Sequence, residues 1–350
     1  MKHIFYHSSI LLFIFLNISC QSQTKLKDDY STKIDSILKT ENIRSFNGNI
    51  LISQNGKTKY SKSYGFKNKE NKTKLKLDDN FIIMSNSKQI TAVLILMEVD
   101  KGKINPQSPI KQYLPELNDS WADTITVHQL LNHTSGIDKI GKPLLYKPGT
   151  SFNYGNQTYN LLGKIISNCN KEPFESVARR LFKKLKMTKT FANHTSKGIE
   201  LVNGHLLQNN TITIVDKFEF SMESLPAAGI ISTVNDLAIW NKNVHHNKIL
   251  KPETYNLMIS YNVKAKHYAF GDNDIGYAYG VRIKDDEYIK MIGHTGMGSG
   301  YVSINFYFPE NDTSLIILEN TMNEDSKISY HFESEIRKIV AKSSLMESIK

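Results

Sequence analysis

The order of strand-like and helix-like segments limits the fold of this chain more than any other feature of its sequence. Residues 47–65 predict two strands joined by the tight Asn55-Gly56 turn, and residues 301–308 alternate as a half-buried strand does. The segments between these ends are mostly helical in pattern. We therefore expect an α+β fold in which one antiparallel sheet is built from about residues 45–86 and 226–345, with a helical subdomain inserted at about 87–225.

The spacing of apolar residues also predicts individual elements. The expected helices cover residues 29–42, 85–101 and 233–246, start near residues 126, 156 and 173, and include a closing helix over about 324–341. The further expected strands are 81–84, 314–318 and a pair, 277–284 and 288–292, joined across Asp285-Asp286. Residues 190–222 are polar and show little periodicity, so they predict no element.

Composition excludes several classes of protein. Apolar residues make up 40% of the chain and charged residues 22%, which is enough to bury a core and excludes wholesale disorder. The two cysteines exclude a disulfide scaffold and a multi-cysteine zinc or iron–sulfur site. Cys169 is expected to pack as a small apolar side chain in a helix. No internal repeat is visible, which argues against solenoid and propeller folds.

The formal net charge is +10, and many of the lysines lie in residues 57–76. We interpret this run as the solvated face of an edge hairpin, in which lysine protects the edge against unwanted pairing. A surface for anionic polymers is the alternative, and its binding would fall steeply as salt is added. Nothing in the sequence resembles a nucleic-acid-binding module, so no nucleic acid partner is expected.

The first residues predict an export signal. Ile10–Leu16 is an apolar run of seven residues, too short to span a bilayer but typical of a signal-peptide core. Ser19 and Cys20 follow as at a bacterial lipoprotein processing site, so we expect residues 1–19 to be the signal, Cys20 to be lipidated and 20–28 to be a tether. Ordinary secretory cleavage near Ser19 is the alternative. Either way the protein is expected in the cell envelope or outside the cell.

The search for a nucleophile centres on one serine. No serine has glycine at both minus two and plus two, which excludes the nucleophile elbow of the α/β-hydrolases. Ser-x-x-Lys occurs four times, but only Ser85 stands where an apolar strand meets a buried helix. Lys88 lies one helical turn further on the same face. Burial and the helix N-terminus both disfavour its charged form, so Lys88 is a candidate base.

Five segments together resemble the serine β-lactamase and penicillin-binding-protein superfamily, in its class C-like branch. They are Phe81–Ala92, Ile125–Gly136, Pro148–Asn156, Pro226–Thr233 and Gly293–Gly296. Their order and spacing agree with that branch, and the resemblance covers roughly residues 45–320. It implies a β-lactamase/transpeptidase-like domain over 29–345, with the active site between the sheet and the helical subdomain.

The resemblance also implies roles for particular residues. Ser85 is acylated, and Lys88 accepts its proton either directly or with Tyr154 as a shared base. Asn156 positions Lys88 and the substrate amide. The backbone N–H groups of Ser85 and Met297 form the oxyanion hole. Substrate contacts are implied for Asn156, His294, Thr295 and Gly296. No metal or cofactor is expected.

Position 294 bears on the substrate. Members of the superfamily that recognise penicillins often carry lysine there, whereas histidine is found in esterase, D-aminopeptidase and D,D-peptidase-like members. A histidine near its reference pKa of ~6.5 offers a cation for a substrate carboxylate only part of the time. Small esters, D-amino-acid amides and peptidoglycan-type peptides are therefore the expected substrates. A penicillin-sensitive D,D-carboxypeptidase or weak β-lactamase stays open, with lysines or Arg282 as the cation.

A third interpretation makes the protein a non-catalytic sensor of cell-wall peptides. Its mark would be the loss of Ser85, Lys88 or Tyr154, and all three are present. Among the other polar and aromatic residues, His133 is expected to bond to the turn that it begins, and Trp121 and Trp240 are expected in the core. The sequence alone gives no oligomeric state.

Overall fold

The main sheet has the topology that the element order predicts. A computed structural model describes residues 1, 28–40, 43–193, 198–209, 211–215, 221–285 and 289–347. Its eight-stranded sheet has the order β10-β11-β12-β13-β14-β15-β1-β2, with every neighbouring pair antiparallel. These strands are Gly48–Gln54 (β1), Lys57–Tyr64 (β2), Val263–His267 (β10), Gly271–Tyr277 (β11), Arg282–Asp285 (β12), Lys290–Gly298 (β13), Tyr301–Phe308 (β14) and Thr313–Glu319 (β15). The N-terminal hairpin thus completes a sheet made mostly by the C-terminal third.

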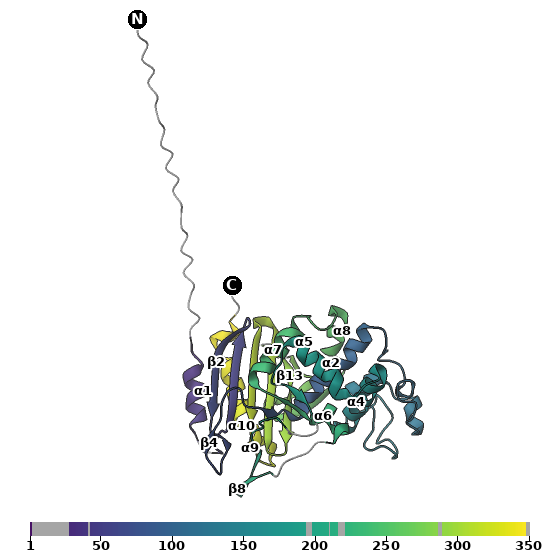
Figure 1. The fold of residues 1–350 in the computed structure, drawn as a ribbon, viewed down its shortest axis with the longest axis horizontal. Coiled ribbons are helices and arrows are strands. Elements are labelled where there is room, and N and C mark those ends of the chain that lie inside the picture. Colours follow the sequence, from purple (N-terminus) through teal and green to yellow (C-terminus); the bar gives the residue numbers. More distant parts are fainter. Residues whose placement is uncertain are drawn as a thin grey trace.

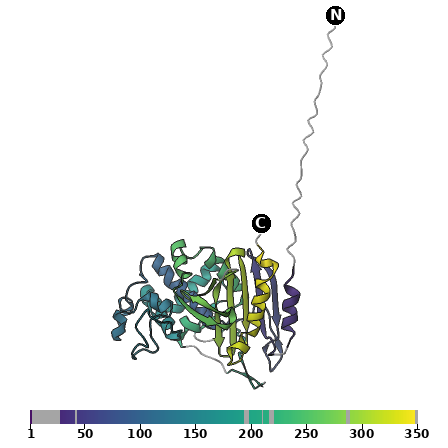
Figure 2. The same ribbon diagram turned by 180° about the vertical axis from the view of Figure 1, so that it is seen from behind.

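Helices cover both faces of this sheet. One face packs against Ser31–Leu38 (α1) and His331–Ala341 (α10), through the alternate residues Val302, Ile304, Phe306 and Phe308 of β14. The other face packs against the helical part of the molecule, which lies beside the sheet in Figure 1. Figure 2 shows α10 against the sheet from behind. The helical part and its loops contain Ser87–Asp100 (α2), Val127–Leu131 (α3), Asn156–Asn170 (α4), Phe174–Leu185 (α5), Leu225–Ala228 (α6), Val234–His245 (α7) and Pro252–Met258 (α8).

Most predicted elements are present, and their ends follow recognisable signals. Asn55 and Gly56 both have positive φ, as a two-residue hairpin turn requires. Thr126 and Gln129 form a reciprocal capping box at the start of α3. The Thr233 hydroxyl accepts the N–H of Asp236 and caps α7.

One predicted strand is wrong. The pattern over 277–284 predicts a single strand, but β11 ends at Tyr277 and β12 begins at Arg282. Gly280 has φ +70° in the turn between them, and a Cβ there would lie 2.6 Å from the main-chain oxygen of Lys88. The chain turns here because it must pass close to α2, which alternation of side chains cannot reveal.

Short elements within 190–222 were also not predicted. This stretch contains Phe191–Ala192 (β6), His205–Gln208 (β7) and Thr211–Ile214 (β8). β6 joins a small sheet with Phe81–Ile82 (β5) and Ile230–Ser232 (β9), while β7 pairs with β8 and with Thr321–Met322 (β16). The remaining short pair is Phe66–Asn68 (β3) with Thr73–Lys74 (β4), and the predicted closing helix is divided at Tyr330 into Ser326–Ser329 (α9) and α10.

Other expectations concern single residues. Trp121 and Trp240 are buried, and Cys169 is half-buried on α4 beside the core. Lys62 of the edge strand β2 pairs with Asp35 at 2.5 Å. Cys20 and the expected signal lie outside the described residues. Within the described part of the chain, the helices are all too short or too polar to cross a membrane.

Candidate active site

Ser85 lies at a tightly fixed bend between strand β5 and helix α2. Met84, immediately before it, has φ +50°, a conformation that non-glycine residues rarely adopt. The bend is pinned to the sheet through Ser303 of β14, whose hydroxyl donates to the Ile83 oxygen at 2.7 Å and accepts from Asn86 Nδ2 at 2.8 Å. Backbone strain of this kind persists only where the surroundings enforce it, and such positions cluster at active sites.

The Lys88 side chain is fully buried and aims its amine at the nucleophile. Its Nζ atom lies 3.1 Å from Ser85 Oγ, 2.8 Å from Asn156 Oδ1 and 2.9 Å from the Ala227 oxygen. Two of these partners, the amide and main-chain oxygens, can only accept hydrogen bonds. A neutral amine has two N–H groups, so donating to both of these oxygens leaves its lone pair facing Ser85 Oγ.

Burial supports this neutral state. Removal from water lowers the pKa of the Lys88 amine, and the nearby Tyr154 opposes the shift without cancelling it. Arg282 adds a smaller contribution that also lowers the pKa of Lys88. A lysine that loses its proton more readily than usual, within hydrogen-bond reach of a serine, meets the geometric requirement for a general base.

Tyr154 and Asn156 come from the turn before α4 and from its first residue. The Lys88 Nζ atom lies 4.9 Å from the centre of the Tyr154 ring. That ring contacts His133 at a centroid distance of 4.6 Å and stacks on His294 at 6.1 Å. The structure therefore brings together the predicted nucleophile, base, tyrosine and asparagine, although they come from segments far apart in the sequence.

His294 lies beneath the site instead of at its surface. Its side chain is fully buried, with Nδ1 2.6 Å from the Thr295 oxygen and Nε2 3.1 Å from the Tyr277 hydroxyl. Burial and the charge of Arg282 hold the pKa of His294 well below its usual range. The imidazole is therefore neutral here, and the expected part-time cation at position 294 is not supplied by this side chain. Substrate binding through His294 stays a prediction.

The neighbouring residues of β13 form the sheet side of the site. β12 pairs with β13 only as far as Gly293, so the edge from His294 to Gly298 is not covered by β12. A Cβ on Gly296 would lie 2.3 Å from the Ile83 oxygen and 2.8 Å from Met84 Cβ. Glycine at this position thus lets the strand approach the nucleophile segment. The Thr295 hydroxyl is buried and contacts His267 Nε2 at 2.9 Å. The oxyanion roles of the Ser85 and Met297 N–H groups stay predictions.

His133 and Arg282 extend the site beyond the residues given most weight by sequence. His133 was expected to bond to the turn that it begins, but its side chain does not. Its imidazole is buried behind Tyr154 and contacts Thr158 Oγ1 and the Tyr277 hydroxyl, at 3.0 and 3.1 Å. The Arg282 guanidinium is 5.3 Å from the Tyr154 ring centre and only 6% exposed. Within the described residues no carboxylate pairs with it, and its Nε has no hydrogen-bond partner.

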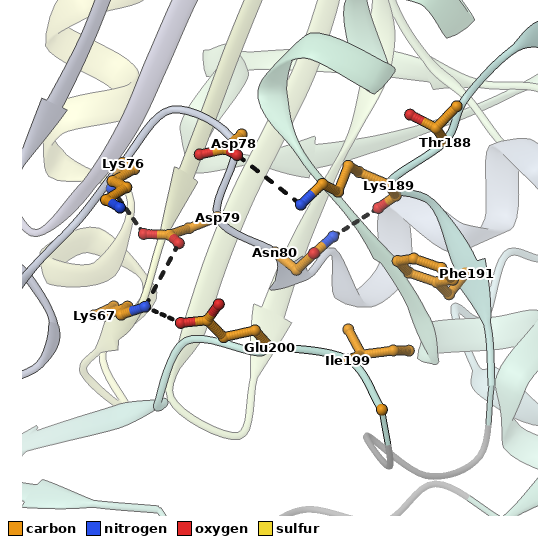
Figure 3. A pocket seen from close by; sticks show the side chains of 11 residues that line it. Lys67, Lys76, Asp78, Asp79, Asn80, Thr188, Lys189, Phe191, Ile199 and Glu200 are labelled. Atoms are coloured by element: carbon orange, nitrogen blue, oxygen red, sulfur yellow. Dashed lines mark hydrogen bonds and ion pairs between the residues drawn. The ribbon is translucent and has the colours of Figure 1, made fainter.

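One pocket among the described residues, shown in Figure 3, lies away from the predicted catalytic residues. Its volume is about 410 Å³, and none of the predicted catalytic residues lines it. Its charges are largely paired with one another: Lys189 lies 3.9 Å from Asp78, and Lys67 contacts both Asp79 and Glu200. Its lining includes no serine or cysteine, so this pocket offers no nucleophile of the predicted kind. No group of three or more His, Cys, Asp or Glu side chains in the described parts of the chain is placed to hold a metal ion.

A model of the β-lactamase family matches residues 40–335. The chain belongs to the β-lactamase family. Among similar proteins, the protein flp of Staphylococcus aureus strain N315 is 27% identical over 344 residues, an alignment that covers 89% of this chain and 68% of that protein. The predicted resemblance to the serine β-lactamase and penicillin-binding-protein superfamily is confirmed.

Solved structures confirm the predicted fold. The octameric penicillin-binding protein homologue from Pyrococcus abyssi superimposes with a TM-score of 0.76 at 23% identity, over 89% of this chain and 78% of that one. The D-amino acid amidase from Ochrobactrum anthropi SV3, solved with D-phenylalanine, gives a TM-score of 0.74 at 20% identity, over 88% and 98%. At these identities the likeness concerns the fold: the chain has the mixed α+β architecture of this family of serine hydrolases.

Two functional groups were missed by sequence reasoning. The Ala227 oxygen lies in a segment whose family resemblance was visible, but a main-chain acceptor leaves no signal in its own side chain. Tyr277 was predicted as the first residue of a strand over 277–284, and only the positions of His133 and His294 show what its hydroxyl contacts. Recognising the turn at Gly280 would have placed Tyr277 at the end of a preceding strand instead of at the start of this one.

Proposed function

We propose that this protein is a serine hydrolase that cleaves ester or amide bonds through an acyl-enzyme on Ser85. One observation carries the proposal: the buried Lys88 amine lies 3.1 Å from Ser85 Oγ while its other two partners can only accept hydrogen bonds. This arrangement leaves the lone pair of a neutral amine available for the serine proton, which is what activates a serine nucleophile.

The reaction follows from these contacts. The Ser85 proton passes to Lys88, directly or with Tyr154 as part of a shared base, while Oγ attacks the substrate carbonyl carbon. The N–H groups of Ser85 and Met297 stabilise the resulting oxyanion, an effect worth about 10²–10³ in rate per donor in known enzymes. The intermediate collapses, and the proton goes to the departing alkoxide or amine. Water then attacks the acyl ester and frees Ser85 by the same proton transfers in reverse.

The substrates that fit best are small esters, D-amino-acid amides and peptidoglycan-type peptides. Support comes from the family and from the fold shared with a D-amino acid amidase. Residues 29–350 would be assayed with p-nitrophenyl esters, D-phenylalanine amide and a D-alanyl-D-alanine peptide, with Ser85→Ala alongside. Hydrolysis that Ser85→Ala abolishes supports the proposal, whereas hydrolysis that survives this change overturns it. Peptide binding without turnover by either protein would favour a non-catalytic sensor.

Arg282 favours a second candidate, a penicillin-sensitive D,D-carboxypeptidase or weak β-lactamase. Such an enzyme needs a cation for the substrate carboxylate, and the described residues give the Arg282 guanidinium no carboxylate partner. Intact-protein mass after incubation with benzylpenicillin tests this candidate. A persistent adduct that Ser85→Ala lacks supports a slowly deacylating peptidase, and hydrolysed drug without an adduct supports a β-lactamase. Intact benzylpenicillin without an adduct would favour the esterase and amidase class.

We also propose that the protein is exported and held at a membrane by a lipid on Cys20. The apolar run Ile10–Leu16 and the Ser19-Cys20 pair support this location. The full chain and Cys20→Ser would be expressed in a bacterium and the cells fractionated. Loss of the membrane-bound form in Cys20→Ser alone supports the anchor, and equal distribution of the two proteins contradicts it.

A further inference from the structure

The hydroxyl of Tyr277 lies between two imidazoles behind the catalytic centre. Its oxygen is 3.1 Å from His133 Nε2 and 3.1 Å from His294 Nε2. All three side chains are fully buried. They come from three separate parts of the fold: His133 from the end of α3, Tyr277 from the end of β11 and His294 from β13. One hydroxyl therefore joins the helical part of the molecule to the sheet.

The acceptor at the His294 end sets the direction of the hydrogen bonds. The Thr295 oxygen can only accept, so His294 Nδ1, 2.6 Å away, carries a proton. In a neutral ring Nε2 is then bare and accepts from the Tyr277 hydroxyl. That hydroxyl has no second proton, so it accepts from His133 Nε2. His133 Nδ1 is then unprotonated and accepts from the Thr158 hydroxyl at 3.0 Å, a hydroxyl that also lies 3.2 Å from the Gly155 oxygen.

In this direction both imidazoles are neutral, and both nitrogens of each ring take part in a hydrogen bond. The charged and titratable groups around the chain of bonds are Lys88, Arg282, Tyr154, Tyr159 and His267. Burial, together with the charge of Arg282, holds the pKa values of His133 and His294 well below the usual range, while burial raises the pKa of Tyr277. The two histidines must then be opposite tautomers, with the proton on Nε2 of His133 and on Nδ1 of His294.

Tyr154 lies directly against this chain of bonds. Its ring is 4.6 Å from the His133 ring, 6.0 Å from that of Tyr277 and 6.1 Å from that of His294. Thr158 and Thr295 lie at the two ends of the chain of hydrogen bonds. Thr158 is on the helix that Asn156 begins, and Thr295 lies two residues before Met297 on β13. The hydrogen bonds thus run between the element that holds the base partners and the strand that carries the predicted oxyanion donor.

We propose that Tyr277 is a positioning residue, whose hydroxyl holds the Tyr154–Asn156 segment and strand β13 in register by linking opposite tautomers of His133 and His294. The hydroxyl touches neither Ser85 nor Lys88, so its effect on the reaction passes through Tyr154 and β13. The effect on turnover rests on the proposed hydrolase function, whereas the pattern of tautomers does not.

Two measurements test the proposal. Long-range ¹⁵N–¹H NMR correlations of histidine-labelled wild type at pH 7, assigned with His133→Gln and His294→Gln, report each tautomer without any substrate. Protonated Nε2 on His133 with protonated Nδ1 on His294 supports the proposal. The same tautomer on both residues, or a charged imidazole on either, overturns it. The tautomers test the proposal even if the protein hydrolyses none of the substrates tried.

Kinetics then separate positioning from general stability. Tyr279 is a matched control because it is also buried and its hydroxyl contacts a histidine, His128 Nδ1, at 2.6 Å. Among the described residues, its ring packs on His128 and not on Tyr154. Tyr277→Phe is expected to lower kcat about 10- to 100-fold with KM nearly unchanged, because a misplaced base costs turnover more than binding. Tyr279→Phe, with a similar loss of thermal stability, should keep kcat. Equal kcat in the two variants, or an unchanged kcat in Tyr277→Phe, overturns the role in positioning.

Discussion

The Nζ atom of Lys88 lies 2.9 Å from the main-chain oxygen of Ala227, which is 139 positions further along the chain. No substitution of the Ala227 side chain removes this acceptor. The contact uses one N–H of the amine, and Asn156 Oδ1 uses a second at 2.8 Å. The lone pair of a neutral amine then faces Ser85 Oγ. Because the two acceptors are fixed, the buried Lys88 is placed to act as a base.

Replacing this lysine tests that geometry. Lys88→Met keeps much of the side-chain volume without an amine, and Lys88→Arg keeps a cation that does not give up its proton. Both should lower hydrolysis about 10²- to 10⁴-fold, the usual contribution of a general base. Activity with the best ester substrate is the measurement, and circular dichroism checks that both variants fold. An arginine variant with nearly wild-type activity would contradict the role of Lys88 as base.

The lowered pKa of Lys88 also predicts how hydrolysis and stability depend on pH. Hydrolysis needs the neutral amine, so kcat/KM should fall as pH decreases through the pKa of Lys88, which is below its ordinary 10.5. The native state binds fewer protons here than the unfolded state, so this group makes stability rise with pH between its lowered pKa and 10.5. Urea unfolding at several pH values should show that rise in wild type and a weaker one in Lys88→Met. Identical slopes would mean that Lys88 is charged in the folded protein.

Arg282 should discriminate between substrates by their charge. Arg282→Met removes the guanidinium, which the described carboxylates leave unpaired, while Arg282→Lys keeps a positive charge. A hydrogen bond to a charged group is worth about 1.5–3 kcal/mol. Arg282→Met should therefore lower kcat/KM about tenfold to 150-fold for a D-alanyl-D-alanine peptide with a free carboxylate. D-phenylalanine amide, which lacks that group, should be affected much less. Equal losses for the two substrates would assign Arg282 to packing around Tyr154.

Gly296 should tolerate no side chain. A Cβ there would lie 2.3 Å from the Ile83 oxygen, and this contact cannot relax without moving the Ser85 segment. Gly296→Ala is expected to cost about 1–3 kcal/mol of stability, the usual range for overpacking, and to lower activity as Ser85 is displaced. Gly155→Ala is the steric control, because no atom lies within 4 Å of the added Cβ. Similar melting temperatures for the two variants would show that strand β13 can shift freely.

Glu319 and Glu333 form a buried pair on the face of the sheet that α10 covers. This pair should make the stability of the protein fall with rising pH. Burial and the neighbouring Glu319 raise the pKa of Glu333 well above 4.5, although Arg44 lies 3.8 Å away. The folded state then holds a proton that the unfolded state releases, so stability is lost as pH rises from 4.5 through the folded pKa. Glu333→Gln mimics the protonated acid and should flatten this dependence. Glu335→Gln, on the same helix but partly exposed beside Lys338, should leave it unchanged; flattening by both changes would contradict the assignment.

The parts of the site that are local in sequence were predictable. Ser85 and Lys88 are three residues apart, and one helical turn brings them together whatever surrounds them. Strand β14 was predicted to the residue because its apolar residues alternate into a single core, although its other face, with Ser303 and Asn305, is buried as well. In contrast, the contacts of Tyr277 depend on where α3 and β13 lie, and no pattern within residues 271–285 contains that information. The neutral, buried state of His294 also depends on packing, whereas the motif alone suggested a part-time cation for a substrate carboxylate.

The place of β1 in the sheet sets an order of events during folding. The Asn47 N–H donates to Glu319 Oε2 across a separation of 272 residues, and β1 pairs with β15 along its whole length. A ribosome that has made the N-terminal hairpin must synthesise nearly the entire chain before that hairpin has its partner. Pairings of such long range fold slowly, because the loop between them must close first. The native sheet of this protein therefore cannot be completed before β15 has been synthesised.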